Sequence, residues 1–384
     1  RPADTMALSG FFFYADTAMT GKVLTKITAI TVLLITILLI PQFYPVGAMI
    51  YFRLALIFWI IFETLRLFKL LLIDRNSPRY LTNSGIMILS LFIVFLILES
   101  VFMFIPRSHG VHYSLAAKLW LAKYWKPVNA YGYRDKEPQN AENVILFVGD
   151  SFTAGHGLKS IEQRFSNIVE RELLKKGEKC FAVNIGAMDA DTVLEYQRMI
   201  YFDYQTRIKP KVVVLQYYGN DIEGVAMKNG MTFGGFHPPA HMNKLLLFIG
   251  SGSYFINYLY WLYPKDFLGI PYLNFLKQAY KNKIILEKHK QDLMKFILYT
   301  RKNSIRLIVV AFPLLQDLEL SDEMYLREII EFFEENHITT INVASLVKDI
   351  PLKRRVININ DAHASCEVHE IVAQEILKTL NVKN

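Results

Sequence analysis

Residues suited to nucleophilic chemistry lie in the second half of the chain. Ser151 is in the run GDSFTAG, directly after the apolar run Val144–Val148. A serine at such a strand-to-helix turn has an exposed hydroxyl, and the N–H groups of the helix that follows can stabilise an anion formed beside it. His363 lies two residues after Asp361. Histidine is the usual base at neutral pH, and a nearby carboxylate can fix its tautomer. These residues predict a catalytic triad of Ser151, His363 and Asp361.

Two further strand ends carry hydrogen-bond donors. Gly186 follows an apolar run, and the absence of a side chain there leaves its N–H open to the site. Asn220, in the run YYGND, offers a side-chain amide. We therefore predict an oxyanion hole formed by the N–H groups of Ser151 and Gly186 and the amide of Asn220. His156 and Asp221 are candidates for substrate contact.

Strands that end at one edge of a sheet must bring these residues together. Short apolar runs alternate with helical patterns after Pro106. The predicted strands are Val144–Val148, Phe181–Ile185, Val212–Tyr217, Leu307–Phe312 and Thr339–Val343. The predicted helices lie near residues 161–176, 192–202, 283–302, 322–336 and 366–380. Such a series predicts an α/β fold with a doubly wound parallel sheet and helices on both faces. Ligands bind outside the carboxyl ends of strands in such sheets.

In order and architecture these motifs resemble the SGNH (GDSL-type) hydrolase superfamily, over about residues 129–380. GDSFTAG, NIGAMDADT, YYGND and DAHASCEVHEIVAQEIL are similar to the family's first, second, third and fifth blocks, and NAYGYRDKE is similar to a lead-in found in many members. The resemblance implies a three-layer, flavodoxin-like α/β domain and acyl transfer without a cofactor. It also implies that Ser151 is the nucleophile, with His363 as base and Asp361 as its partner.

The chain departs from the family pattern around its last block. Val368 stands where a Gly usually precedes the second histidine, and Ala364 replaces the common Pro. These departures leave His369 as an alternative base, although it falls inside a predicted helix. His237 and His241 are four residues apart but flank prolines in a loop, so no metal site is expected.

The first hundred residues have the character of a membrane region. We predict a tail over residues 1–21 and a transmembrane region over 22–106, with spans at about 27–43, 48–72 and 85–105. The last of these, 85–105, is long enough to cross a hydrocarbon core of about 30 Å. A linker over 107–140 then leads to the hydrolase-like domain, 141–384. The domain has an insertion at about 222–282 that is rich in aromatic residues. It suits a lid, an acyl-binding wall or a membrane-surface contact, and equally an ordinary elaboration that packs on the sheet.

Lys and Arg set the predicted orientation. Lys22 and Lys26 precede the first span, whereas Arg75 and Arg79 lie between the second and third. Because basic loops stay in the cytoplasm, the domain after Pro106 is predicted to be periplasmic or extracellular, on a bacterial inner or plasma membrane. The alternative for the first span is a cleaved signal peptide, since Val46-Gly47-Ala48 resembles a cleavage site.

Composition excludes several other classes. Of 384 residues, 52% are hydrophobic, which excludes a disordered chain, and only 2 are Cys, which excludes a disulfide scaffold. The net charge is +8, but no block of Lys and Arg of the nucleic-acid-binding type is present.

The expected function is that of a membrane-anchored esterase or acyl transferase acting on envelope glycans, with the lipid bilayer, an acyl-ester substrate and membrane proteins as partners. The alternatives are a lipase or lysophospholipase, and a non-catalytic subunit of a membrane complex.

Overall fold

The chain folds as two units. The computed structural model describes residues 4–73, 79–111, 113–139, 142–233, 244–264 and 266–381. A helical unit combines the described parts of Arg1–Arg107, His112–Ala122 and His241–Leu262. An α/β unit combines the described parts of Ser108–Val111, Lys123–Ala240 and Tyr263–Asn384. The chain passes between the units more than once, so neither unit is one continuous stretch of sequence.

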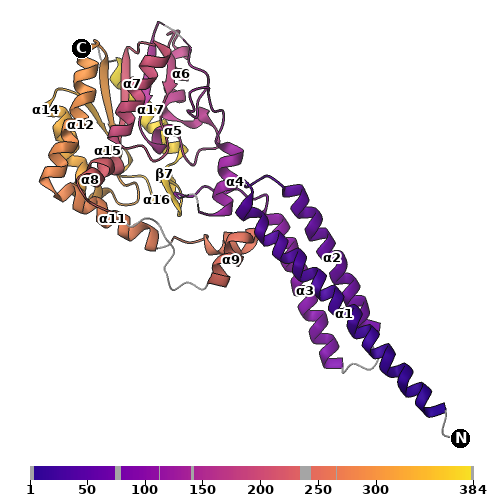
Figure 1. The fold of residues 1–384 in the computed structure, drawn as a ribbon. Coiled ribbons are helices and arrows are strands. Elements are labelled where there is room, and N and C mark those ends of the chain that lie inside the picture. The colour runs from indigo at the N-terminus through magenta and orange to yellow at the C-terminus, as the bar shows by residue number, and fades with distance from the viewer. Residues whose placement is uncertain are drawn as a thin grey trace. The chain divides into compact units, whose positions relative to one another are not determined.

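A parallel sheet forms the centre of the α/β unit (Figure 1). Its strands are β1 Val144–Val148, β2 Phe181–Asn184, β3 Val212–Tyr217, β4 Arg306–Ala311 and β5 Thr339–Asn342, in the spatial order β2-β1-β3-β4-β5. The short strands β6 Val356–Asn358 and β7 Asp361–Ala364 form a separate antiparallel pair. The predicted parallel α/β sheet is confirmed, and each of its five strands begins and ends within one residue of the predicted bounds. The β6–β7 hairpin was not predicted.

Helices cover both faces of the sheet. They are α5 Ser151–Ala154, α6 Phe165–Lys175, α7 Thr192–Thr206, α8 Glu223–Lys228, α11 Asp266–Lys281, α12 Lys283–Lys302, α13 Leu318–Ser321, α14 Arg327–Glu335, α15 Val343–Val347, α16 Leu352–Arg355 and α17 Cys366–Asn381, with the short turns η1 Ile161–Gln163, η2 Gly219–Ile222 and η3 Asp322–Leu326.

The strands are apolar on both sides because each face packs on helices. Val144, Leu146 and Val148 join one buried cluster with residues of α7, α11, α12 and α14. Ile145 and Phe147 point the other way and join a second cluster with residues of α6, α15 and α17. Continuous apolar strands of this kind are typical of a sheet that is buried on both faces.

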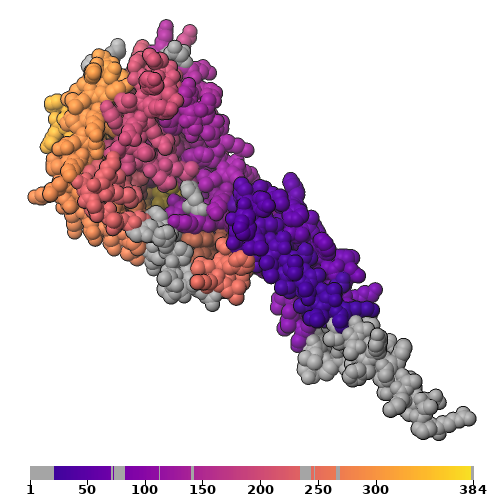
Figure 2. All heavy atoms as spheres, in the orientation of Figure 1, coloured from indigo at the N-terminus to yellow at the C-terminus, as the bar shows by residue number. Residues whose placement is uncertain are grey.

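Among its described residues, the helical unit contains two helices that are long and apolar enough to cross a membrane. Its helices are α1 Asp4–Phe43, α2 Ile50–Ile73, α3 Arg79–Phe102, most of α4 Leu115–Tyr124, α9 Lys244–Gly252 and α10 Tyr254–Tyr260. The two candidate spans are Gly21–Phe43 and Asn83–Phe102, with mean hydropathies of 2.5 and 2.6. Only 17% and 11% of their most apolar stretches are buried, and Figure 2 shows the outer surface of the N-terminal helices in indigo.

The second predicted span, 48–72, forms a helix with more charged residues than the other two. α2 carries Arg53, Glu63, Arg66 and Lys69, and it is not among the candidate spans. The structure therefore offers two candidate spans, and α2 stays a prediction.

A buried ion pair joins α2 and α3 to the inserted helices α9 and α10. Arg53 of α2 contacts Glu99 of α3, and both side chains are 2% exposed. Arg53 also donates to the Gly252 carbonyl at 2.7 Å. The Glu99 carboxylate accepts hydrogen bonds from Ser253 Oγ at 2.7 Å, Tyr254 N at 2.8 Å and Phe255 N at 3.0 Å. Glu99 therefore satisfies N–H groups at the start of α10, which have no acceptor inside that helix.

Replacing Glu99 by Ala should destabilise the helical unit strongly. The Arg53 guanidinium would stay buried without its carboxylate, and breaking a buried pair in this way costs about 3–5 kcal/mol. The measurement is thermal unfolding of the purified, detergent-solubilised protein. Arg66→Ala is the matched control, because the Arg66 side chain is 53% exposed in its pair with Glu63, and loss of such a pair costs about 1 kcal/mol or less. Equal effects of the two substitutions would contradict the role of the Arg53–Glu99 pair.

Candidate active site

Ser151, His363 and Asp361 form a continuous hydrogen-bonded chain. Ser151 begins α5 directly after β1, whereas Asp361 and His363 lie on β7. Ser151 Oγ is 2.8 Å from His363 Nε2, and His363 Nδ1 is 2.5 Å from Asp361 Oδ1. This is the geometry in which a histidine can take the serine proton while a carboxylate holds the ring. The structure brings the three predicted catalytic residues together.

The turn that carries Ser151 is held by its neighbours in sequence. Asp150 caps α5, because its Oδ1 accepts a hydrogen bond from Phe152 N at 2.8 Å. Gly155 ends the turn at φ +72°, and a Cβ there would lie 2.6 Å from Arg164 Cγ. Burial raises the pKa of Asp150 to about 6, against the lowering effects of the Phe152 N–H, of His363 and of the Asn220 and Gln216 side chains. The Asn220 amide therefore faces the residue next to the candidate nucleophile.

His363 is poised as a base by the charge beside it. Burial lowers its pKa, but the Asp361 carboxylate outweighs burial, and Asp150 and Asp189 act in the same direction as Asp361. The net result is a pKa above the ordinary 6.5. Burial raises the pKa of Asp361, but His363, His156 and Ser108 together hold it well below its usual range. Asp361 is therefore a carboxylate, and His363 can accept a proton readily.

Gly186 has a packing role that its sequence position did not reveal. A Cβ at Gly186 would lie 2.4 Å from Ala154 N, so only glycine lets β2 approach the Ser151 turn this closely. The Gly186 N–H donates to Asn184 Oδ1 at 3.0 Å. Its donation to an oxyanion stays a prediction, and would require that this hydrogen bond be shared or exchanged.

The two candidates for substrate contact are interior residues. His156 is 2% exposed and lies beside the triad, with its Nε2 3.6 Å from Asp361 Oδ2. Asp221 is fully buried, and its Oδ2 accepts a hydrogen bond from Tyr218 N at 2.9 Å. Neither side chain is exposed to an incoming substrate.

His369 has a different role from His363. It is 1% exposed, its Nδ1 accepts a hydrogen bond from Phe165 N at 3.2 Å, and its ring stacks on Phe165. Burial lowers its pKa to about 3. The structure therefore assigns the contact with Ser151 to His363 and a packing role to His369.

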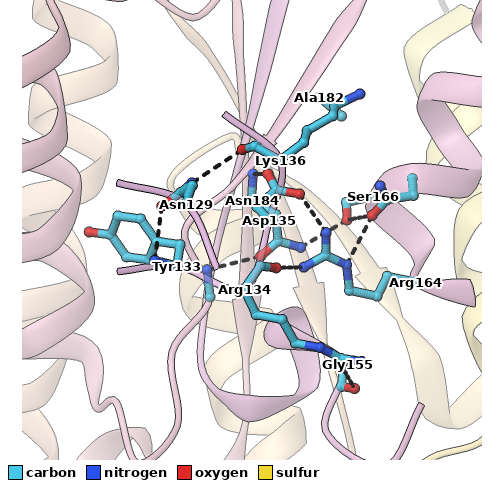
Figure 3. A network of polar contacts seen from close by, with 12 residues as sticks. Asn129, Tyr133, Arg134, Asp135, Lys136, Gly155, Arg164, Ser166, Ala182 and Asn184 are labelled. Carbon is cyan, nitrogen blue, oxygen red and sulfur yellow. Dashed lines mark hydrogen bonds and ion pairs between the residues drawn. The ribbon is translucent and has the colours of Figure 1, made fainter. Parts of the chain in front are cut away.

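A buried polar network supports the Ser151 turn from the lead-in segment (Figure 3). Arg134 donates to the carbonyls of Gly155 at 2.5 Å and Leu158 at 2.7 Å. Asp135 pairs with Arg164 at 2.6 Å and accepts a hydrogen bond from Asn184 N at 2.8 Å. Burial lowers the pKa of Arg134 to about 9, with Arg164 adding to the effect. The sequence signalled this network only through the run NAYGYRDKE, and none of its side chains was predicted as part of the site.

His156, Asp361 and His363 also have the composition of a small metal site. Their ligand atoms lie within 4.8 Å of one another. Both ring nitrogens of His363 already bond to Ser151 and Asp361, an arrangement that suits proton transfer. His237 and His241 lie outside the described residues.

Comparisons with known proteins give structural likenesses only. No family model matches the chain, and no curated protein matches it. Solved structures similar to it include TesA, with 13% identity and a TM-score of 0.40, over 62% of this chain and 98% of that one. The acetyl xylan esterase AlAXEase has 17% identity and a TM-score of 0.39, over 62% and 99%. The esterase EstA from Pseudoalteromonas sp. has 11% identity and a TM-score of 0.38, over 63% and 100%. Likenesses at this level do not transfer an activity to this chain.

The reactivity of Ser151 should fall as the pH falls through a midpoint above 6.5. Protonated His363 cannot accept the Ser151 proton, and Asp361 raises the pKa of His363 above its ordinary value. The measurement is the rate at which a fluorophosphonate reagent labels the protein as a function of pH. In Asp361→Asn, which removes the carboxylate bonded to His363 Nδ1, the midpoint should move to lower pH. A wild-type midpoint below 6.5 would contradict this assignment.

Proposed function

We propose that this protein is a membrane-anchored serine esterase or acyl transferase of the SGNH type. The observation that carries the proposal is the hydrogen-bonded chain from Ser151 through His363 to Asp361. Its order along the sequence, with serine at the first strand end and Asp-x-His before the last helix, is the order of the SGNH motifs. The resemblance of the GDSFTAG, NIGAMDADT and YYGND runs supports the same assignment.

The mechanism follows from the positions of these atoms. Ser151 Oγ attacks the carbonyl carbon of an ester while His363 Nε2 takes the hydroxyl proton. We expect the N–H groups of Ser151 and Gly186 and the amide of Asn220 to stabilise the tetrahedral oxyanion. His363 then gives its proton to the leaving alcohol, and an acyl-Ser151 intermediate remains. Water or an acceptor hydroxyl, deprotonated by His363, releases the acyl group and restores Ser151.

The helical unit supplies the proposed anchor. Gly21–Phe43 and Asn83–Phe102 have the length and composition of spans, and most of their surface is not covered by protein. A core helix of a soluble protein would be mostly buried, so these exposed apolar surfaces favour lipid as their surroundings. If α2 is a third span, the distribution of Lys and Arg favours a location of the α/β unit outside the cytoplasm.

Acyl esters on envelope glycans are the substrates that best suit a catalytic domain anchored outside the cytoplasm. A lipase or lysophospholipase is the second candidate, supported by the proximity of a bilayer.

The third candidate is a non-catalytic subunit of a membrane complex. The contacts of the charged residues in the helical unit weaken one argument for it. Arg53, Glu63 and Glu99 are charged side chains in apolar helices, where such charges can contact partner helices. Instead, Arg53 pairs with Glu99, and Glu63 pairs with Lys26 at 2.5 Å and with Arg66 at 3.2 Å. These charges are therefore satisfied within the chain.

Hydrolysis of a simple acetyl ester should depend on Ser151. The wild-type protein in detergent is expected to release p-nitrophenol from p-nitrophenyl acetate and to add one fluorophosphonate label by intact mass, whereas Ser151→Ala does neither. Ser321→Ala is the matched control, because Ser321 is a buried serine on α13. A folded wild type that neither hydrolyses the ester nor takes up the label would refute the catalytic proposal and favour the accessory subunit.

Acyl-chain preference should separate the two enzyme classes. A glycan deacetylase or acetyltransferase is expected to prefer acetyl over octanoyl and palmitoyl esters, because its acyl pocket needs to hold only one methyl group. A lipase should show the reverse order, since each additional buried CH₂ contributes about 0.8 kcal/mol. The measurement is kcat/KM along a series of p-nitrophenyl esters, and a rise with chain length would overturn the glycan assignment.

A further inference from the structure

The second oxygen of the Asp361 carboxylate has its own buried partner. Asp361 Oδ1 accepts hydrogen bonds from His363 Nδ1 at 2.5 Å and from the His363 backbone N–H at 3.2 Å. Asp361 Oδ2 accepts a hydrogen bond from the hydroxyl of Ser108, which lies 253 residues earlier in the chain. Asp361 is fully buried and Ser108 is 5% exposed. Both oxygens of the carboxylate are therefore engaged away from solvent.

Ser108 is held in place by the hairpin that carries Asp361 and His363. It belongs to the four-residue segment Ser108–Val111, which is part of the α/β unit. The residue before it, Arg107, is part of the helical unit. Asn358 Nδ2 donates to the Ser108 carbonyl at 3.0 Å, and Gly110 N donates to the Asn360 carbonyl at 2.8 Å. This segment therefore runs along the β6–β7 hairpin, and its backbone is held there by hydrogen bonds at Ser108 and at Gly110.

His156 completes the surroundings of Asp361. Its Nε2 lies 3.1 Å from the His109 carbonyl, 3.4 Å from Ser108 Oγ and 3.6 Å from Asp361 Oδ2. A carbonyl and a carboxylate only accept hydrogen bonds, so Nε2 carries the hydrogen in this arrangement. The Ser108 hydroxyl then donates to Asp361 while its oxygen faces the His156 N–H. The two side chains fix the rotation of the carboxylate about its Cβ–Cγ bond.

We propose that Ser108 is a positioning residue of the active site, which holds the Asp361 carboxylate in the orientation that presents Oδ1 to His363. The proposal rests on the proposed serine hydrolase function. Because a carboxylate that can rotate places the imidazole less well, loss of the Ser108 hydroxyl lowers the rate of acylation without touching the substrate. The catalytic centre is thus completed by a residue outside the 141–384 domain predicted from the sequence.

The test compares Ser108→Ala, Ser108→Thr and Ser108→Cys with the wild-type full chain. A hydrogen bond to a charged group contributes enough for its loss to slow kcat about ten- to a hundredfold. Ser108→Ala should therefore show that loss in the hydrolysis of p-nitrophenyl acetate, with KM little changed. Ser108→Thr keeps the hydroxyl and should restore most of the rate. Ser108→Cys keeps the volume with a weaker donor and should fall between Thr and Ala.

The pH profile separates positioning from a loss of folded protein. Without the Ser108 donor, more of the Asp361 charge faces His363, so the acid limb of kcat should move to higher pH in Ser108→Ala. The other groups that face this pair are His156 on the Asp361 side, and Asp150 and Asp189 on the His363 side. They are unchanged among the variants. Rates are referred to the fraction of Ser151 that a fluorophosphonate labels at completion, so a misfolded fraction does not count.

Each outcome decides the proposal. A tenfold or greater loss in Ser108→Ala, restored by Ser108→Thr and accompanied by the shifted acid limb, supports it. Wild-type-like kinetics in Ser108→Ala would overturn it while leaving the hydrolase function in place. The same holds if Ser108→Ala and the control Ser321→Ala lose the same amount of activity and the acid limb of kcat moves in neither. An unreactive Ser151 in the folded wild type would overturn both. If Ser108→Ala does not fold, a wild-type rate in Ser108→Cys overturns the proposal, and a reduced rate restored by Thr supports it.

Discussion

The buried charge of Asp361 is the constraint on which the candidate site depends. Taking a carboxylate out of water costs several kcal/mol unless it is paired and hydrogen-bonded. Here His363 satisfies one oxygen and Ser108 the other. The spacing of two between Asp361 and His363 fits this requirement, because residues i and i+2 of a strand point to the same face. β7 thus delivers both members of the pair to one side of the hairpin, and that side faces α5 and the Ser151 hydroxyl.

The need to pair buried polar groups also explains the two buried arginines near the Ser151 turn, Arg134 and Arg164. α5 has only four residues, and the carbonyls of Ala154 at its end and of Gly155 and Leu158 beyond it accept hydrogen bonds from a side chain of the lead-in segment. Arg134 supplies donors to these carbonyls, and a guanidinium suits that task because it offers five N–H groups in one plane. Arg164 in turn needs Asp135, since neither of their side chains is more than 3% exposed. The end of α5 thus depends on Arg134, and Arg164 depends on Asp135. Together these contacts hold the Ser151 turn in place.

The sequence predicted the features that depend on local pattern and could not predict those that depend on long-range contacts. Strands such as Val144–Val148 have a continuous apolar signature, and Ser151, His363 and Asp361 occur in short motifs next to predicted element ends. Ser108 has no such signature, because its hydrogen bond to Asp361 crosses 253 residues. Gly186 was predicted from the same logic as Asn220, but the structure shows why glycine is required there, namely the close approach to Ala154 N.

The boundary predicted at residues 107–140 treats the chain as two domains in series, whereas the units exchange segments. Within the described residues, Ser108–Val111 packs with the α/β unit, while 113–122 and 244–262 pack with the helical unit. The segment 244–262 is held in the helical unit by Glu99, whose carboxylate binds the start of α10. The segment Ser108–Val111 is held in the α/β unit by Ser108, whose hydroxyl binds Asp361. If either segment left, one oxygen of a buried carboxylate, Glu99 Oε2 or Asp361 Oδ2, would lose the hydrogen-bond donors that the segment supplies. An α/β core cut at its first strand would keep the three residues that react and lose Ser108, Arg134 and Asp135, which hold them in position.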